Sequence, residues 1–236
     1  MAKIVFDIET VGEDFEALDE TTQEVLTRWL KKESESEEEY KIALEELKNG
    51  LGFSPLTGQI VAIGTLDYDT MKGGVYFQAP GVDIEPFEEN GIKFKPMTEK
   101  EMLEQFWKIA NNCNEFISFN GRGFDAPFLS VRSAIHKIRP TKDLMRGRYL
   151  YQQGSCLHID LIDQLTFYGA VRKKGALHLW CRAFGIKSPK ADGVSGDDVG
   201  RLFKAKEYAK IARYNAGDLY AQKELYDYWD RYVRFS

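Results

Sequence analysis

Short runs of apolar and β-branched residues alternate along this chain with longer segments whose apolar positions recur every three to four residues. The short runs predict β-strands, and the longer segments predict amphipathic helices. Strands are expected over 2–9, 59–68, 74–79 and 115–119, with another short apolar element over 157–162. Helices are expected over 99–111, 126–137, 176–184, 197–204 and 207–232. Strands that dominate the first half and helices that dominate the second are typical of an α/β domain with one mixed sheet.

Residues 13–50 follow the first strand and have a different pattern. Their apolar residues recur at helical spacing among many acids, which predicts two amphipathic helices joined by the Glu- and Ser-rich run 33–39. With no internal repeat and no domain linker, we expect a single domain over 1–236, in which residues 11–56 are an acidic helical insertion. Because phosphate would be repelled by so acidic a segment, we expect a flank or a lid there, and a candidate surface for a protein partner.

Hydrophobic residues make up 43% and aromatic residues 13% of the 236 positions, enough for a sizeable core and too much for a disordered chain. No apolar run approaches the roughly 20 residues that a membrane span needs, so no membrane association is expected. The three cysteines are far apart and odd in number, which excludes a disulfide framework and a compact CxxC zinc site. A reducing, cytoplasmic location is therefore expected.

The formal net charge of −5 is unevenly distributed. Residues 1–120 hold 11 basic and 25 acidic side chains, whereas residues 121–236 hold 21 basic and 12 acidic ones. Two basic clusters in the second half consist of Arg132, Lys137, Arg139, Lys142, Arg146 and Arg148, and of Arg172, Lys173, Lys174, Arg182, Lys187 and Lys190. Each cluster is either a solvated surface or part of a basic face for a polyanion such as nucleic acid.

Three short segments carry the candidate chemistry, and the first is FDIET, residues 6–10. Residues two apart on a strand point to the same face, so Asp7 and Glu9 would lie side by side. Like charges on one strand face repel each other, and a divalent cation such as Mg²⁺ or Mn²⁺ would remove that penalty. The alternative is a pair of solvated acids at the end of a strand.

The second segment, FISFNGRGFDAPFL over 116–129, predicts a strand, a glycine-flanked loop and a helix. Asp125 lies two residues before Pro127, close to where a helix N-cap belongs. It is therefore either a cap or a functional acid. The glycines permit close approach of a ligand to the backbone, and Asn120 and Phe124 lie in the same loop.

The third segment is YNAGD, residues 214–218. Residues four apart on a helix share a face, so Tyr214 and Asp218 would project together, unless the helix breaks at Asn215 and Gly217. The three segments together supply four carboxylates and one tyrosine. Four acids can hold two divalent cations about 3.5–4 Å apart, the arrangement that clamps the attacking and leaving oxygens of an in-line displacement at phosphorus.

The order D-x-E, N-x-x-x-F-D and Y-x-x-x-D resembles the three exonuclease motifs of the DEDD superfamily of 3′–5′ exonucleases. In particular, the chain is similar to the tyrosine branch (DEDDy) and to stand-alone relatives of the proofreading domain of B-family DNA polymerases. The matching residues, in motif order, are Asp7 and Glu9, Asp125, and Asp218 with the branch-defining Tyr214. The histidine branch has His five residues before the last Asp, where this chain has Arg213.

The resemblance implies a ribonuclease H-like fold, with a central mixed β-sheet flanked by helices. It also implies a metal-dependent hydrolase that removes nucleoside 5′-monophosphates from the 3′ ends of single-stranded nucleic acid, with DNA favoured over RNA. Its cofactors would be two divalent ions, Mg²⁺ or Mn²⁺. The alternative is a catalytically weak nucleic-acid-binding or protein-interaction module on the same scaffold.

The resemblance assigns roles to the matching residues. Asp7 would bridge both metal ions, Glu9 and Asp218 would complete the site of the attacking water, and Asp125 would hold the second ion. Tyr214 would orient the water, because an ordinary phenol titrates near 10 and is a poor base at neutral pH. The candidates for holding the terminal nucleotide are Thr10, Asn120 and Phe124.

Overall fold

The computed structural model describes residues 2–188, 193 and 195–235, and strands among these residues form one seven-stranded sheet. The strands are β1 (Ala2–Gly12), β2 (Gly58–Asp67), β3 (Gly73–Phe77), β4 (Phe87–Glu89), β5 (Ile92–Pro96), β6 (Cys113–Ser118) and β7 (Leu157–Asp160). Their order across the sheet is β4-β5-β3-β2-β1-β6-β7. Strand β1 is antiparallel to β2 and parallel to β6, and β6 is parallel to β7. The carboxyl ends of β1, β6 and β7 therefore meet at one edge of the sheet.

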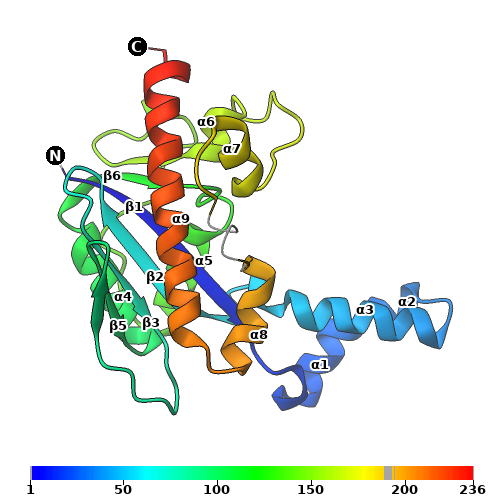
Figure 1. Cartoon of the computed structure of the whole chain (residues 1–236). Coiled ribbons are helices and arrows are strands. Elements are labelled where there is room, and N and C mark those ends of the chain that lie inside the picture. The colour runs from blue at the N-terminus through cyan, green and yellow to red at the C-terminus, as the bar shows by residue number, and fades with distance from the viewer. Residues whose placement is uncertain (1, 189–192, 194, 236) are drawn as a thin grey trace.

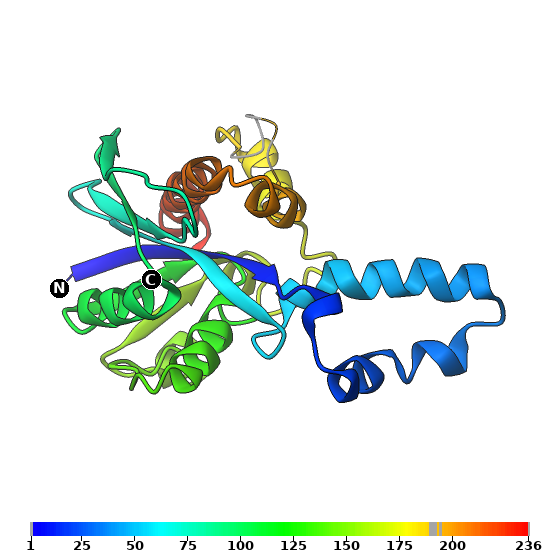
Figure 2. The same cartoon turned by 90° about the horizontal axis from the view of Figure 1, so that it is seen from below.

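Helices cover both faces of the sheet, which confirms the predicted α/β architecture. The helices on one face are α4 (Glu99–Ala110) and α5 (Asp125–Ile135), and those on the other are α7 (Leu177–Phe184), α8 (Val199–Lys204) and α9 (Tyr208–Tyr228). Figure 1 shows α9 lying across β1 and β2, and Figure 2 shows the green helices α4 and α5 on the opposite side of the strands. The element at 157–162 divides into β7 and the short helix α6 (Leu161–Leu165).

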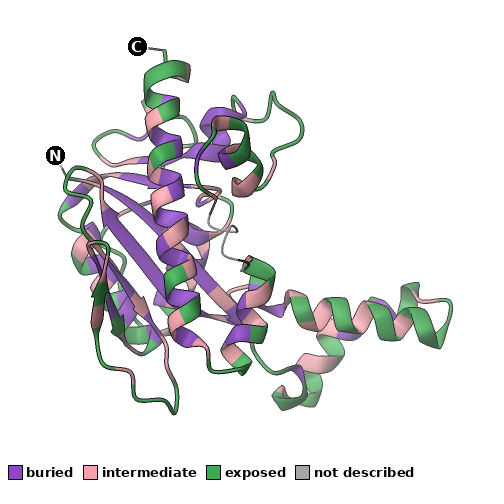
Figure 3. Ribbon diagram, in the orientation of Figure 1, coloured by how far each residue is buried: buried purple, intermediate pink, exposed green. Residues whose placement is uncertain are grey.

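The alternation of side chains along β1 determines what lies on each face. Ile4, Phe6 and Ile8 are buried in the core beneath α4 and α5. Val5 and Val11 are buried in the core beneath α9. Since side chains on a strand alternate between faces, the odd-numbered positions of β1 face α9, and these include Asp7 and Glu9. The buried positions concentrate along β1 and the inner side of α9 (Figure 3).

The predicted insertion forms an arm that projects from the carboxyl end of β1 (Figures 1 and 2). It contains α1 (Glu20–Thr27), α2 (Leu30–Glu33) and α3 (Glu37–Gly50). The arm thus has three helices where two were predicted, and the connection predicted over 33–39 is confined to 34–36, because α2 ends at Glu33 and α3 begins at Glu37. Ser36 accepts the backbone N–H of Glu39 as an N-cap, and the glutamates of the first turn interact favourably with the helix dipole.

The hairpin of β4 and β5 was missed by the sequence analysis, although the chain contains its signal. Asn90 and Gly91 connect the two strands, and both have positive φ angles, of 50° and 83°. A two-residue turn with that backbone is the usual consequence of an Asn-Gly pair. None of the helices described here is both long and apolar enough to cross a membrane.

Candidate active site

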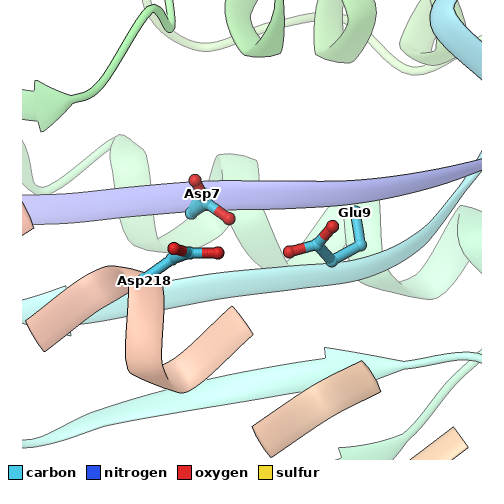
Figure 4. A group of neighbouring side chains, drawn as sticks. All are labelled: Asp7, Glu9 and Asp218. Carbon is cyan, nitrogen blue, oxygen red and sulfur yellow. The ribbon is translucent and has the colours of Figure 1, made fainter. Parts of the chain in front are cut away.

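Three carboxylates from two distant parts of the chain lie together where α9 crosses β1. Asp7 and Glu9 project from β1 and Asp218 projects from α9, with one oxygen of each carboxylate within 4.8 Å of the others. Figure 4 shows the Asp7 and Asp218 carboxylates beside each other, with Glu9 further along the same strand. Glu9 and Asp218 are buried and Asp7 is partly buried. The structure thus brings together the acids of the first and third predicted segments.

The same face of α9 also holds Asp7 in place through two amide side chains. Asn215 Nδ2 donates to Asp7 Oδ2 at 2.8 Å, and Gln222 Nε2 donates to Asp7 Oδ1 at 2.7 Å. Both amides are buried. The sequence analysis missed them, although their spacing from Asp218 by three and four residues places all three on one helical face. The helix runs unbroken through this segment, so the alternative of a break at Asn215 is wrong.

A glycine in β2 makes room for this arrangement. Gly64 is paired with Asp7 in the register of β1 and β2. A Cβ atom on Gly64 would lie 2.1 Å from Asn215 Oδ1 and 2.9 Å from a methyl carbon of Leu219. Because neither contact is sterically possible, α9 can approach the sheet this closely only where β2 has no side chain.

Asp125 reaches the site from the opposite side of β1. It is the first residue of α5, and its Oδ1 accepts a hydrogen bond from the backbone N–H of Ile8 at 3.0 Å. The N-cap of α5 is Phe124, which makes no side-chain cap, so Asp125 binds another element rather than capping its own helix. The carboxylate of the second segment therefore lies against the backbone of β1, at the residue between Asp7 and Glu9.

The loop before Asp125 is fixed by Asp160, at the end of β7. Asp160 accepts the backbone N–H groups of Asn120 and Arg122, each at 2.9 Å, and also that of Ile162, which caps α6. Asn120 adopts a positive φ of 63°, a conformation that Asn tolerates better than most residues. Asp160 therefore both caps α6 and fixes the loop that precedes Asp125.

The electrostatics of the cluster favour the binding of a cation. Burial raises the pKa of Asp7 and of Glu9 well above the usual range. The charge of Asp218 raises the pKa of Asp7 further, and the charges of Asp7 and Asp218 raise that of Glu9. The pKa of Asp125 is also well raised, by burial and then by the charge of Asp7. A divalent cation would offset these costs, and an all-carboxylate donor set is suited to Mg²⁺ or Mn²⁺.

A polar cleft joins these groups. It is lined by Asp7, Ile8, Glu9, Phe119, Asn120, Phe124, Asp125, Leu177, Tyr214, Asp218 and Gln222. The cleft therefore contains all five predicted catalytic residues and two of the three predicted substrate-binding residues. Thr10 is not among its described lining residues, and its hydroxyl donates to the carbonyl oxygen of Gly52 at 2.7 Å, at the base of the arm.

Comparison with known proteins shows what the chain as a whole is similar to. A family model described as "Predicted 3'-5' exonuclease related to the exonuclease domain of PolB" matches residues 66–232. That span includes Asp125, Tyr214 and Asp218, whereas Asp7 and Glu9 precede it. No curated protein matches the chain.

One solved structure that matches is the family B DNA polymerase from the hyperthermophilic archaeon Pyrobaculum calidifontis. The TM-score is 0.57 at 14% sequence identity, over 97% of this chain and 24% of the polymerase. At this identity the likeness concerns the fold, and the predicted ribonuclease H-like α/β fold is confirmed. The chain corresponds to about a quarter of the length of that polymerase.

Proposed function

The chain belongs to a family of predicted 3′–5′ exonucleases related to the exonuclease domain of PolB, and on this basis we propose that it is a metal-dependent 3′–5′ exonuclease of the tyrosine branch of the DEDD superfamily. Its substrate is the 3′ end of single-stranded DNA, or of RNA, and its products are nucleoside 5′-monophosphates. One observation carries the proposal: Asp7, Glu9 and Asp218 converge within 4.8 Å although they come from opposite ends of the chain.

The carboxylates would hold the metal ions that such chemistry requires. Asp7, Glu9 and Asp218 would hold one Mg²⁺ or Mn²⁺, and Asp7 with Asp125 would hold a second. When bound, two such ions supply a metal-activated water and neutralise charge on the phosphodiester. Asn215 and Gln222 keep the carboxylate of Asp7 turned toward the cluster, so that it need not reorganise when it binds a cation.

Tyr214 is the positioning group for the attacking water in this proposal. Its pKa is raised, first by burial and then by the nearby charge of Asp218, with which it also forms a hydrogen bond. A phenol that stays protonated at neutral pH orients water and does not abstract its proton. Tyr214 lies one helical turn before Asp218 and lines the same cleft.

The terminal nucleotide would lie against the loop that Asp160 fixes. Phe124 is partly exposed in the cleft. Its ring meets that of Phe53 edge-on at a centroid distance of 6.5 Å and lies tilted against that of Phe128 at 5.4 Å. An aromatic ring that is held in place by its neighbours can stack on any of the bases. Asn120 would contact the sugar or phosphate, and Thr10, at the base of the arm, remains the third predicted contact.

The acidic arm is the proposed site for a protein partner. Residues 13–57 carry 13 acidic and 5 basic side chains, and Val25, Trp29 and Ile42 are more than half exposed on it. This combination suits a basic amphipathic segment of another protein and repels nucleic acid. Replacing Glu37, Glu38 and Glu39 by Gln should weaken binding of a Lys-rich amphipathic peptide and leave oligonucleotide cleavage unchanged. Equal peptide affinity in the variant would refute this surface.

The exonuclease proposal is tested by digesting 5′-labelled single-stranded DNA and RNA with Mg²⁺, Mn²⁺ or EDTA. Wild-type protein should produce a ladder that shortens from the 3′ end and needs a metal. Asp7→Asn should abolish the ladder, whereas Asp83→Asn, which changes an exposed acid of a distant loop, should not. Failure to cleave either polymer with either metal would favour the alternative of a binding module.

A further inference from the structure

The segment that connects α6 and α7 exposes an aromatic ring and three consecutive cations. Phe167 is 52% exposed. Arg172, Lys173 and Lys174 follow it, and all three are exposed. Within the part of the chain that the structure describes, none of these three cations forms an ion pair. Of the basic cluster predicted here, Lys190 lies outside the described residues. The segment thus offers positive charge that no acid among the described residues neutralises.

The backbone at the exposed Phe167 is conformationally strained. Phe167 and Tyr168 have φ angles of 50° and 55°, a region that L-residues with large side chains rarely occupy. Buried Thr166 stabilises the turn, since its backbone N–H and its hydroxyl both donate to the carbonyl oxygen of Ile162. A Gly at position 167 would have the same turn without strain. The fold therefore retains a strained aromatic residue whose ring packs on little of the protein.

Neighbouring tyrosines extend the aromatic surface. The ring of Tyr168 lies 4.6 Å from that of Tyr149, and Tyr149 is stacked on Tyr151 at 5.7 Å with an angle of 11° between the rings. Tyr151 is 83% exposed. Arg148, next in sequence to Tyr149, pairs with Asp163 of α6 at 2.8 Å and fixes this loop to the segment. The rings of Tyr151, Tyr149 and Tyr168 therefore form one contiguous row, and Tyr168 is next in sequence to the exposed Phe167.

The cationic segment adjoins the helix that lines the carboxylate cleft. Leu177 lines the cleft and comes three residues after Lys174. Trp180 of α7 donates its ring N–H to the carbonyl oxygen of Lys174 at 2.7 Å, so the cationic segment is tied to the helix that borders the site. Figure 1 shows α6 and α7 together beside α9, with their connecting segment in yellow-green.

We infer that residues 167–174, together with Tyr149 and Tyr151, bind the single-stranded nucleic acid upstream of the 3′ end that lies in the carboxylate cleft. This inference rests on the proposed exonuclease function. Bases would stack on Phe167 and Tyr151, and phosphates would pair with Arg172, Lys173 and Lys174. Exposed rings that stack on bases, combined with cations that pair with phosphates, are the usual means of holding a single strand without reading its sequence.

The test measures binding apart from cleavage, by fluorescence anisotropy of 5′-fluorescein-labelled dT12 and rU12 in EDTA. Phe167→Gly removes the ring and suits the backbone, so the variant should fold at least as well as wild type and bind about 5- to 100-fold more weakly. Trp29→Ala is the matched control, because Trp29 is equally exposed at 52% but lies on the acidic arm. It should leave the affinity unchanged.

The cations are tested by salt dependence. Lys173→Ala with Lys174→Ala should reduce the slope of log Kd against log salt concentration by about 1.4, because two phosphate contacts of about 0.7 each are lost on a single strand. Lys93→Ala with Lys95→Ala is the control, since these lysines are exposed on β5, four strands from β6 in the sheet. The effect of both test variants should decrease when the oligonucleotide is shortened to three residues.

The outcomes separate this inference from the exonuclease proposal. Wild-type affinity and salt slope in the Phe167 and Lys173/Lys174 variants would overturn the inference, whether or not the protein cleaves. Weakened binding by these variants, in a protein that cleaves nothing with Mg²⁺ or Mn²⁺, would support the inference and refute the exonuclease. Absence of binding by wild-type protein to both oligonucleotides would refute the inference outright.

Discussion

Asn215 of α9 donates a hydrogen bond to Asp7 of β1 at 2.8 Å, and it does so across a separation of 208 residues. The side-chain oxygen of the same Asn has no hydrogen-bond partner among the described residues, and neither has that of Gln222. A buried carbonyl oxygen without a partner costs free energy. In each amide the N–H group bonds to Asp7 while the oxygen stays unpartnered among the described residues. The orientation of Asp7 is therefore maintained at the expense of two other hydrogen bonds.

Replacing Gly64 by Ala should destabilise the protein. The added Cβ would lie 2.1 Å from Asn215 Oδ1, so α9 must move away from β2 or Asn215 must release Asp7. We expect a loss of about 1–3 kcal/mol in the free energy of unfolding, measured in urea, together with loss of cleavage. Gly200→Ala is the control, because its Cβ would meet nothing within 4 Å, and it should be neutral or stabilising.

Replacing Asn215 or Gln222 by Ala should weaken metal binding. Each change removes one N–H donor that orients Asp7, and loss of such a partner typically costs 10- to 100-fold in metal affinity. Titration of Mn²⁺ followed by electron paramagnetic resonance measures this effect directly, without cleavage. Unaltered Mn²⁺ affinity in both variants would show that the amides serve the packing of α9 alone.

The protein without metal should lose stability as the pH rises. The pKa values of Asp7, Glu9 and Asp125 are raised by burial and mutual repulsion, so the folded state favours their neutral forms. The free energy of unfolding should therefore fall as the pH rises from the unfolded-state pKa near 4 through the raised folded-state values. Thermal unfolding in EDTA at several pH values measures this slope.

Two comparisons control the pH experiment. Addition of Mn²⁺ at pH 7 should raise the melting temperature of wild type and raise that of Asp7→Asn much less. Asp7→Asn should be more stable than wild type in EDTA at that pH, because it removes one charge, and either amide can turn its unpartnered oxygen toward the new Asn. If Asp7→Asn were less stable than wild type in EDTA at pH 7, repulsion among the carboxylates would not be what destabilises the metal-free protein.

His158 should contribute an opposite dependence at acid pH. It is buried, its Nδ1 donates to the carbonyl oxygen of Leu144, and its pKa is lowered to about 4, mainly by burial. Stability from the neutral ring is complete above the unfolded-state pKa of 6.5 and is lost as the pH falls toward 4, by about 3 kcal/mol. The difference in unfolding free energy between wild type and His158→Gln should shrink over that window.

Local spacing in the sequence was enough to predict much of the site. Asp7 and Glu9 share a face because β1 is a strand, and Tyr214 and Asp218 share a face because α9 is a helix, and the structure has both elements. Thr98 and Glu101 form the capping box that their spacing predicts at the start of α4. These relationships depend only on the periodicity of one element. The hairpin at Asn90 and Gly91 is also a local relationship, because an Asn-Gly pair between two short strands indicates its turn.

Other relationships were decided by the tertiary structure alone. No pattern along the chain indicates that Asn215 and Gln222 bond to Asp7, that Gly64 leaves space for Asn215, or that Asp125 bonds to the N–H of Ile8. Each of these contacts depends on how α9 and α5 pack on a sheet whose register is set elsewhere. The periodicity of a helix or strand determines which of its side chains share a face. The residues that contact this face are determined only by the packing of the elements in the folded protein.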